Sequence, residues 1–233
     1  MKLQERLLDE VVLVPCVGER EARRLCVMSL VAEWAGEAHG DRPICASPVV
    51  RGYAVALNDC LPDDCRQLLK PFAPVIVGTQ DTADRERRAL LLDAVLEDVA
   101  PAGLRALLGS GTARESETAQ VLLHGWPSWA CASSNELLGV LASGKASASP
   151  FLSALNGVIS RFVEADDEAF GKAVGKLLGH AADVQPTERG RRRVWLMGID
   201  MLDRISSLRG DWMDSDFSSG EDTRTLVSRS AAS

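Results

Sequence analysis

The sequence predicts an all-α fold, a compact multi-helix bundle of about eight to ten helices followed by a disordered C-terminal tail. Leucine, alanine and valine are abundant, while aromatic residues make up only 5% of the 233 residues. This composition favours helices packed through aliphatic side chains over a sheet sandwich. Apolar residues also recur at steps of three and four through most of the chain, which is the period of one helix face.

The first part of the chain predicts a helical entry and two central helices. Residues 3–14 have a modest amphipathic pattern, which a proline and a glycine then interrupt. Residues 19–36 follow as a helix that opens with the charged run EREARR and continues into an apolar stretch, LCVMSLVAEWAG, that only Ser29 and Glu33 interrupt. We expect this helix and the next one, at 48–61, to lie at the centre of the bundle.

The helix at 48–61 has the clearest boundaries in the chain. Ser47 can accept a hydrogen bond from an unpaired amide as an N-cap, and Pro48 suits the first helical position because proline has no N–H to leave unpaired there. Pro62 ends this helix and starts a second one, which runs to Lys70. A proline then stops it, and a short apolar connector follows.

Seven further helices are expected, at residues 82–100, 101–109, 112–124, 135–143, 150–164, 166–183 and 187–208. Gly171, Gly175 and Gly179 weaken the helix at 166–183 by about 1 kcal/mol each relative to alanine. Their spacing of four residues, however, places them on one line of the helix, where they allow a close contact with a neighbouring helix.

Glycine and serine at 109–116 mark the best candidate linker. It separates an N-terminal helical core at 1–109 from a C-terminal helical part at 117–209, which can belong to the same domain. Residues 210–233 are polar, acidic and rich in serine, with few apolar anchors. This composition predicts a disordered tail.

Two ranges, 24–79 and 194–206, carry a resemblance to other proteins. The segments concerned are CVMSLVAEWAGE, DRPICASPVV, LNDCLPDDCRQLLKP and PVIVGT in the first range, and WLMGIDMLDRIS in the second. They resemble a family of uncharacterised bacterial helical proteins, some of them alanine-rich, to which no activity is assigned. The resemblance implies a helical bacterial protein and transfers no catalytic residue.

Net charge and hydropathy limit the classes of partner and the cellular compartment that we expect for this protein. The formal net charge of −7 argues against a general nucleic-acid binder, whose surface is usually basic. Glu5, Asp9 and Glu10 interrupt the place where a signal peptide needs an apolar core, and no run approaches the ~18 to 20 apolar residues of a membrane span. We therefore expect a cytoplasmic protein with reduced thiols and no membrane association.

Four residues around the helix at 48–61 are the candidates for metal or thiol chemistry. Cys60 and Cys65 lie five residues apart, and His39 and Cys45 belong to the preceding loop. Thiolate and imidazole ligands suit zinc, but a C-x4-C spacing without a second tight pair departs from the usual sites. The alternative is that the cysteines are small buried hydrophobic residues, and we expect no cofactor.

Glu33 is the candidate for acid–base chemistry because it lies inside the apolar run LVAEWAG. A buried carboxyl group there would have a raised pKa, and Asp59 at the end of the next helix could approach it. There are two structural alternatives. Glu33 could belong to a solvated line with Ser29 and Glu37, or it could pair with an arginine such as Arg51.

Two arginine clusters are the candidates for binding an anion or a nucleic acid. One opens the helix at 82–100 and the other opens the last helix beside Trp195; together they comprise Arg85, Arg87, Arg88, Arg189, Arg191, Arg192 and Arg193. Guanidinium groups bind phosphate, and a tryptophan can stack on a base. Consecutive residues point around a helix, however, so the alternative is a solvated helix start.

Trp126 and Trp129 are the candidates for contact with a protein partner. They lie close together in HGWPSWACASS, a segment that we expect to be irregular. Tryptophan is enriched at binding hot spots, although this pair can instead cover an edge of the core.

The common catalytic signatures are missing from the sequence, among them GxxxxGK[ST], GxGxxG after a strand, GxSxG and HExxH. We therefore expect a non-enzymatic helical module that binds another protein. A nucleic-acid-associated subunit and a small metal or thiol protein are the alternatives.

Overall fold

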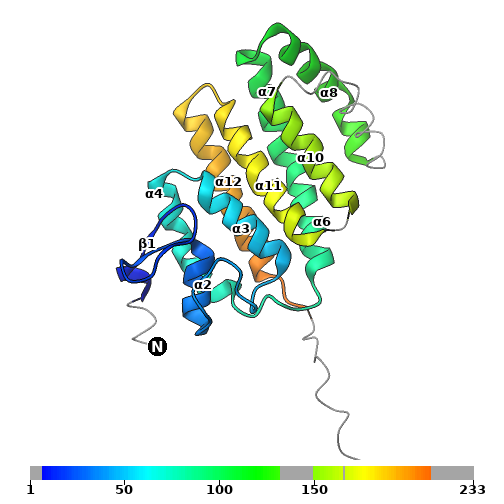
Figure 1. Cartoon of the computed structure of the whole chain (residues 1–233). Helices are drawn as coiled ribbons and strands as arrows, with labels where there is room; N and C mark the ends of the chain where they lie inside the picture. Colours follow the sequence, from blue (N-terminus) through cyan, green and yellow to red (C-terminus); the bar gives the residue numbers. More distant parts are fainter. Residues whose placement is uncertain (1–6, 132–148, 165, 211–233) are drawn as a thin grey trace, which may run out of the picture.

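The computed structural model describes residues 7–131, 149–164 and 166–210. Helices form most of this part of the chain, so the prediction of an all-α fold is confirmed (Figure 1). The sheet in the described residues consists of three strands of two residues each, β1 (Val12–Leu13), β2 (Gly18–Glu19) and β3 (Arg24–Leu25). Strand β3 is central, parallel to β1 and antiparallel to β2.

This small sheet and its turns replace the end of the helix predicted for residues 3–14 and the first part of the helix predicted for residues 19–36. Among the described residues before the sheet, 7–10 are helical, and the second helix, α2 (Val27–Ala35), begins eight residues late. Cys16 and Arg23 have positive φ angles of 59° and 54°, which a continuous helix does not permit. The sequence prediction failed here because charged residues at 19–24 suit a helix and a tight turn equally well.

A buried asparagine on α3 (Pro48–Cys60) fixes the start of α2. The side chain of Asn58 accepts a hydrogen bond from the N–H of Val27 at 3.2 Å and donates one to the carbonyl of Val14 at 2.8 Å. Helix α2 therefore packs at one end of the bundle beside the sheet, rather than at its centre (Figure 1).

Helix α3 has the predicted boundaries. The hydroxyl of Ser47 accepts a hydrogen bond from the N–H of Val50 at 3.3 Å, and Pro48 occupies the first turn. The next predicted helix continues past its expected end. It becomes α4 (Asp63–Arg66), the 3-10 helix η1 (Gln67–Phe72) and α5 (Ala73–Ile76). Pro71 lies inside η1, where the change of helix type tolerates its missing N–H.

The helix predicted at 82–100 begins at Asp84 and is longer than expected. Helix α6 (Asp84–Ala94) passes through a π-helical turn, η2 (Val95–Val99), directly into α7 (Ala100–Ser110). The loop between α7 and α8 (Ala113–Cys131) is only two residues long.

The backbone of Trp126 and Trp129 is helical, so the prediction of an irregular segment there is wrong. The helix predicted at 135–143 lies outside the described residues.

The last three predicted helices are confirmed within a residue or two. They are α10 (Pro150–Glu164), α11 (Asp167–Asp183) and α12 (Glu188–Ser207). Asp166 caps α11 and Thr187 caps α12, each accepting a hydrogen bond from the backbone N–H three residues later. The predicted tail begins at Gly210, and residues 211–233 lie outside the described part of the chain.

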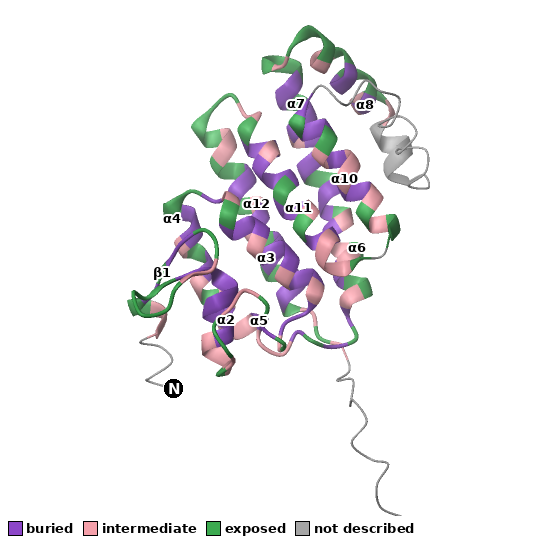
Figure 2. Cartoon of the chain, in the orientation of Figure 1, coloured by how far each residue is buried: buried purple, intermediate pink, exposed green. Residues whose placement is uncertain are grey.

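Helices α3 and α11 lie side by side at the centre of the fold, as the glycine spacing predicted (Figure 1). A Cβ atom built on Gly171 would lie 2.3 Å from the carbonyl oxygen of Val49, and one built on Gly52 would lie 2.1 Å from that of Glu168. No residue with a side chain fits these positions unless the two backbones move apart. Figure 2 shows the buried faces of α3, α10, α11 and α12 turned toward one another.

One hydrophobic core cluster includes side chains from both sides of the proposed linker, from Val11 to Ile205. The division into domains at 109–116 stays a prediction.

Candidate functional site

Arg87, one of the candidate anion-binding residues, is fully buried and bound within the protein. Its guanidinium group contacts Asp81 at 2.6 Å and Asp84 at 2.9 Å. It also donates hydrogen bonds to the backbone carbonyls of Ile205 at 3.1 Å and Leu208 at 2.9 Å. Arg87 therefore anchors the end of α12 to the start of α6, and no external anion can reach it.

Asp81 is held in its charged form by this network. Burial opposes ionisation, but hydrogen bonds from Arg87 and from the N–H groups of Gly210 and Ala83, together with the charge of Arg87, outweigh it and lower the pKa of Asp81 to about 2. The same network holds Gly210, which had been expected to begin the tail.

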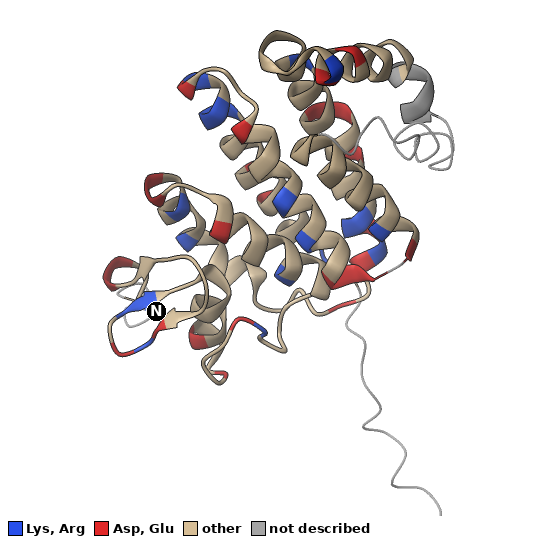
Figure 3. Ribbon diagram, turned by 45° about the horizontal axis from the view of Figure 1, so that its top comes forward, with Lys and Arg blue, Asp and Glu red and all other residues tan. Residues whose placement is uncertain are grey.

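The other arginines do not form one patch. Arg88 pairs with Asp167 at 3.1 Å and covers the rings of Phe162 and Phe170 on the inner side of the fold, while Arg85 is exposed. The second cluster opens α12, a helix of 20 residues, whereas Arg87 contacts its last turn. The two clusters are thus separated by most of a helix about 30 Å long (Figure 3).

Trp195, expected as a stacking platform beside the second cluster, is buried. Arg191 pairs with Glu188 at 2.8 Å, and Arg192 pairs with Asp64 at 3.1 Å. Arg189 and Arg193 are exposed and have no ion pair among the residues that the structure describes. The cluster is therefore partly neutralised by its own neighbours.

Glu33 is neither a partner of Asp59 nor part of a solvated line. Its carboxylate contacts Arg23 at 2.7 Å and Arg20 at 3.8 Å, both from the turn between β2 and β3. Asp59 is exposed and accepts a hydrogen bond from the N–H of Cys16 at 2.8 Å. The alternative of a solvated line fails because Ser29 is fully buried, whereas the alternative of pairing with an arginine is confirmed, with Arg23 and Arg20 as the partners.

The arginine suggested as a partner of Glu33, Arg51, instead binds Glu168 at 2.6 Å.

The candidate metal ligands are not brought together. Cys65 is buried, His39 is exposed, and Cys60 packs beneath Gly179 at the end of α3. In the described part of the chain, no three histidine, cysteine or acidic side chains lie close enough to hold a metal ion.

The thiol of Cys45 is instead part of a braced loop. Burial, a hydrogen bond to Glu37 and the charge of that carboxylate raise the pKa of Cys45 to about 12. Glu37 also accepts hydrogen bonds from the N–H groups of Ile44 at 2.6 Å and Cys45 at 2.9 Å. Ile44 in this loop is 81% exposed. Among the described residues, no other large hydrophobic residue close to it in the sequence is exposed. A single exposed apolar side chain is common on monomeric proteins.

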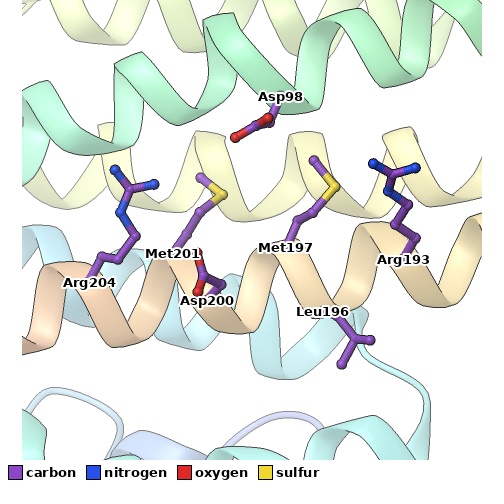
Figure 4. Close-up of a pocket in the computed structure, with 7 residues that line it drawn as sticks. All are labelled: Asp98, Arg193, Leu196, Met197, Asp200, Met201 and Arg204. Atoms are coloured by element: carbon purple, nitrogen blue, oxygen red, sulfur yellow. The ribbon is translucent and has the colours of Figure 1, made fainter.

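The exposed side of α12 combines a hollow, an exposed apolar side chain and several charged groups. A hollow of about 260 Å³ lies between α12 and the η2 turn (Figure 4). It is lined from α12 by Arg193, Leu196, Met197, Asp200, Met201 and Arg204, and from η2 by Asp98. Figure 4 shows the two methionines pointing across the hollow toward the helix that carries Asp98, with the two arginines at its ends. None of the four charged side chains forms an ion pair or hydrogen bond with another described residue.

Leu196 borders this hollow and is 46% exposed. A second half-exposed leucine, Leu68, belongs to η1. Two contacts, one before and one after Leu68 in the sequence, join this segment to α12. Asp64 contacts Arg192, and the carbonyl of Val75 accepts a hydrogen bond from Arg209. The segment Asp63–Ile76 therefore runs beside α12 in the same direction, and its η1 part, which carries the 44% exposed Leu68, packs against α12.

A second hollow, of about 400 Å³, lies between α10 and α11. Its lining consists mainly of small residues, and Lys176 and His180 are its charged or titratable members. It borders Pro150, close to residues 132–148, which the structure does not describe. The side chains of Trp126 and Trp129, the predicted partner contacts, also lie outside the described residues.

Sequence reasoning included Arg193 but missed Leu196, Asp98 and Asp200. The apolar stripe of α12, with Val194, Met201, Leu202 and Ile205 inside, leaves Leu196 on the outer side, so this signal was available in the sequence. Asp98 could not be found in that way, because only the packing of η2 against α12 brings it to the hollow.

Comparisons with known proteins found no matching family model, no similar curated protein and no similar solved structure. None of the described helices combines the length and the hydropathy that a membrane span requires.

Proposed function

We propose that the protein is a non-enzymatic interaction module that binds another protein chain through the exposed face of α12. The observation that carries this proposal is the combination of two leucines that are about half exposed, Leu196 and Leu68, with a hollow at α12 that is lined by two methionines. We call the exposed residues of α12 together with Leu68 and Asp98 the α12 face.

The composition of the α12 face suits a protein partner. Apolar side chains lie at its centre, and charged groups of both signs surround them, which is the arrangement of an interface core and rim. Methionine side chains adapt to a partner because they are unbranched and polarisable. Arg193, Arg204, Asp98 and Asp200 lack internal partners among the described residues, so a binding partner can pair with them without first breaking an ion pair.

The nucleic-acid alternative has less support. Arg87 is buried, Arg88 faces inward, and the two clusters lie at opposite ends of α12. The metal alternative rests on His39, Cys45, Cys60 and Cys65, which are dispersed. Cys16, Cys26, Cys45, Cys60 and Cys65 are unpaired, which favours our proposal of a reducing cytoplasmic location.

The test is affinity capture from an extract of the native cell, with protein and nucleic acid both identified. We expect a stoichiometric protein, either a different chain or untagged copies of this one, that is lost with Leu196→Glu. The matched control is Val163→Glu on α10, which changes an apolar residue of similar exposure away from α12. Capture that is unchanged by Leu196→Glu, or nucleic acid released by salt, would overturn the proposal.

A further inference from the structure

We propose that the partner of the α12 face is a second copy of this chain, bound with the two α12 helices antiparallel and crossing at Leu196. This inference rests on the proposed function and identifies its partner. It follows from the order of charges along the exposed side of α12.

The exposed charges of α12 differ in balance on the two sides of Leu196. Glu188 and three arginines, Arg189, Arg192 and Arg193, precede it, while two carboxylates, Asp200 and Asp203, and one arginine, Arg204, follow it, so the first half is basic overall and the second half acidic overall. A closed dimer with two-fold symmetry brings the same surface of each copy together, so this surface must be complementary to itself. Antiparallel packing satisfies that condition, because the basic half of each helix meets the acidic half of the other. Parallel packing would bring like charges together.

The spacing along the helix matches in detail. With a rise of 1.5 Å per residue, Arg193 lies about 4.5 Å before Leu196 and Asp200 about 6 Å after it. Reversing one helix about Leu196 therefore places Arg193 of one copy opposite Asp200 of the other, within about 2 Å along the axis. The two residues are seven apart and lie on the same side of the helix, beside the hollow that Asp98 also lines. Each copy thus inserts an arginine between two carboxylates of the other.

The other apolar and charged groups agree with this arrangement, apart from Arg204, which lies in the mainly acidic half. Leu196 meets its own symmetry mate, and Leu68 of each copy lies beside the crossing point, which gives the interface an apolar centre. Arg189 comes opposite Asp203. Arg192 already pairs with Asp64, but both side chains are more than half exposed, so this ion pair contributes little and Arg192 can turn to the second copy. Glu188 and Arg191 neutralise each other.

The test uses charge reversal and mixing of the full-length protein, with sedimentation velocity as the measurement. Arg193→Asp places two acidic residues opposite each other twice in the dimer, and Asp200→Arg places two basic residues opposite each other twice. We expect each variant alone to self-associate at least about tenfold more weakly than the parent chain. In an equimolar mixture, Arg193→Asp and Asp200→Arg restore opposite charges at both contacts, so we expect a mixed dimer with near-parental affinity.

Two controls keep the outcome unambiguous. Circular dichroism of each variant checks that it is folded, and Arg161→Asp on the exposed surface of α10 controls for the change in net charge. A parent chain that stays monomeric, or single variants that do not recover on mixing, would overturn the proposal of a second copy. If a different protein is nevertheless captured and lost with Leu196→Glu, the interaction module stands and only its partner was misassigned.

Discussion

The side chain of Arg87 connects three segments that are far apart in the sequence. Asp81 and Asp84 supply its counter-charges, while Ile205 and Leu208 supply carbonyl acceptors from the end of α12. A charged group buried this completely needs all of these partners, because each unmade interaction costs free energy in the protein interior. The run RERR at residues 85–88 suggests solvated charge, so only the fold reveals that Arg87 is structural.

Replacing Arg87 with methionine is therefore expected to destabilise the protein strongly. Arg87→Met leaves the buried carboxylate of Asp81 without its cation, and we expect a loss of about 3 to 5 kcal/mol in the free energy of unfolding. Arg85→Met, two residues away and exposed, should change stability by no more than about 0.5 kcal/mol. Urea denaturation of both variants measures this difference, and equal losses would contradict the structural role of Arg87.

The lowered pKa of Asp81 predicts a defined dependence of stability on pH. A carboxyl group with a pKa of about 2 in the folded state and a usual value of 3.8 stabilises the fold above the unfolded-state value, and this contribution disappears as the pH falls toward 2. The shift corresponds to about 2 kcal/mol. The stability gap between the parent chain and Asp81→Asn should therefore be constant above about pH 5 and shrink by that amount at lower pH. A gap independent of pH from 5 to 2 would show that Asp81 is not the titrating group.

Among the elements, the contact between α3 and α11 was predictable because glycine leaves a clear signal. Three glycines spaced by four residues in an otherwise good helix sequence indicate a line of close approach, and the structure confirms this for Gly171 and Gly175. The boundaries of α10, α11 and α12 were also predictable, since caps and apolar period agree there. The three short strands were not, because their pairing depends on Asn58 and Asp59 from a distant helix.

The α3–α11 contact predicts opposite effects for two glycine-to-alanine changes. Gly171→Ala adds a methyl group against the backbone of α3, so we expect destabilisation by about 1 to 3 kcal/mol in spite of alanine's higher helix propensity. Gly157→Ala on α10 meets no atom within 4 Å and should stabilise the protein by up to about 1 kcal/mol. Thermal unfolding of Gly171→Ala and Gly157→Ala, each compared with the parent chain, measures these two changes in stability. If both variants gained stability, the close approach of the helices would be wrong.

For the whole molecule, the sequence predicted the fold class but not the surface on which we place its function. The candidate arginines, acid and thiols were chosen by residue type, and most of them are engaged in holding the fold together. The α12 face depends on three segments, α12 itself, η1 and η2, that meet only after folding. In the sequence, this face is marked by Leu196, which lies between a mainly basic and a mainly acidic half of one helix. That pattern can be interpreted only when the opposite side of the helix is known to be buried.

The central claim is that the α12 face binds a second copy, and the molar mass in solution tests it most directly. Sedimentation velocity over a range of protein concentrations should show the parent chain and Val163→Glu approaching twice the chain mass of 25.1 kDa, while Leu196→Glu remains at the single-chain mass. If Leu196→Glu and the parent chain have the same mass at every concentration, the α12 face is not the site of self-association.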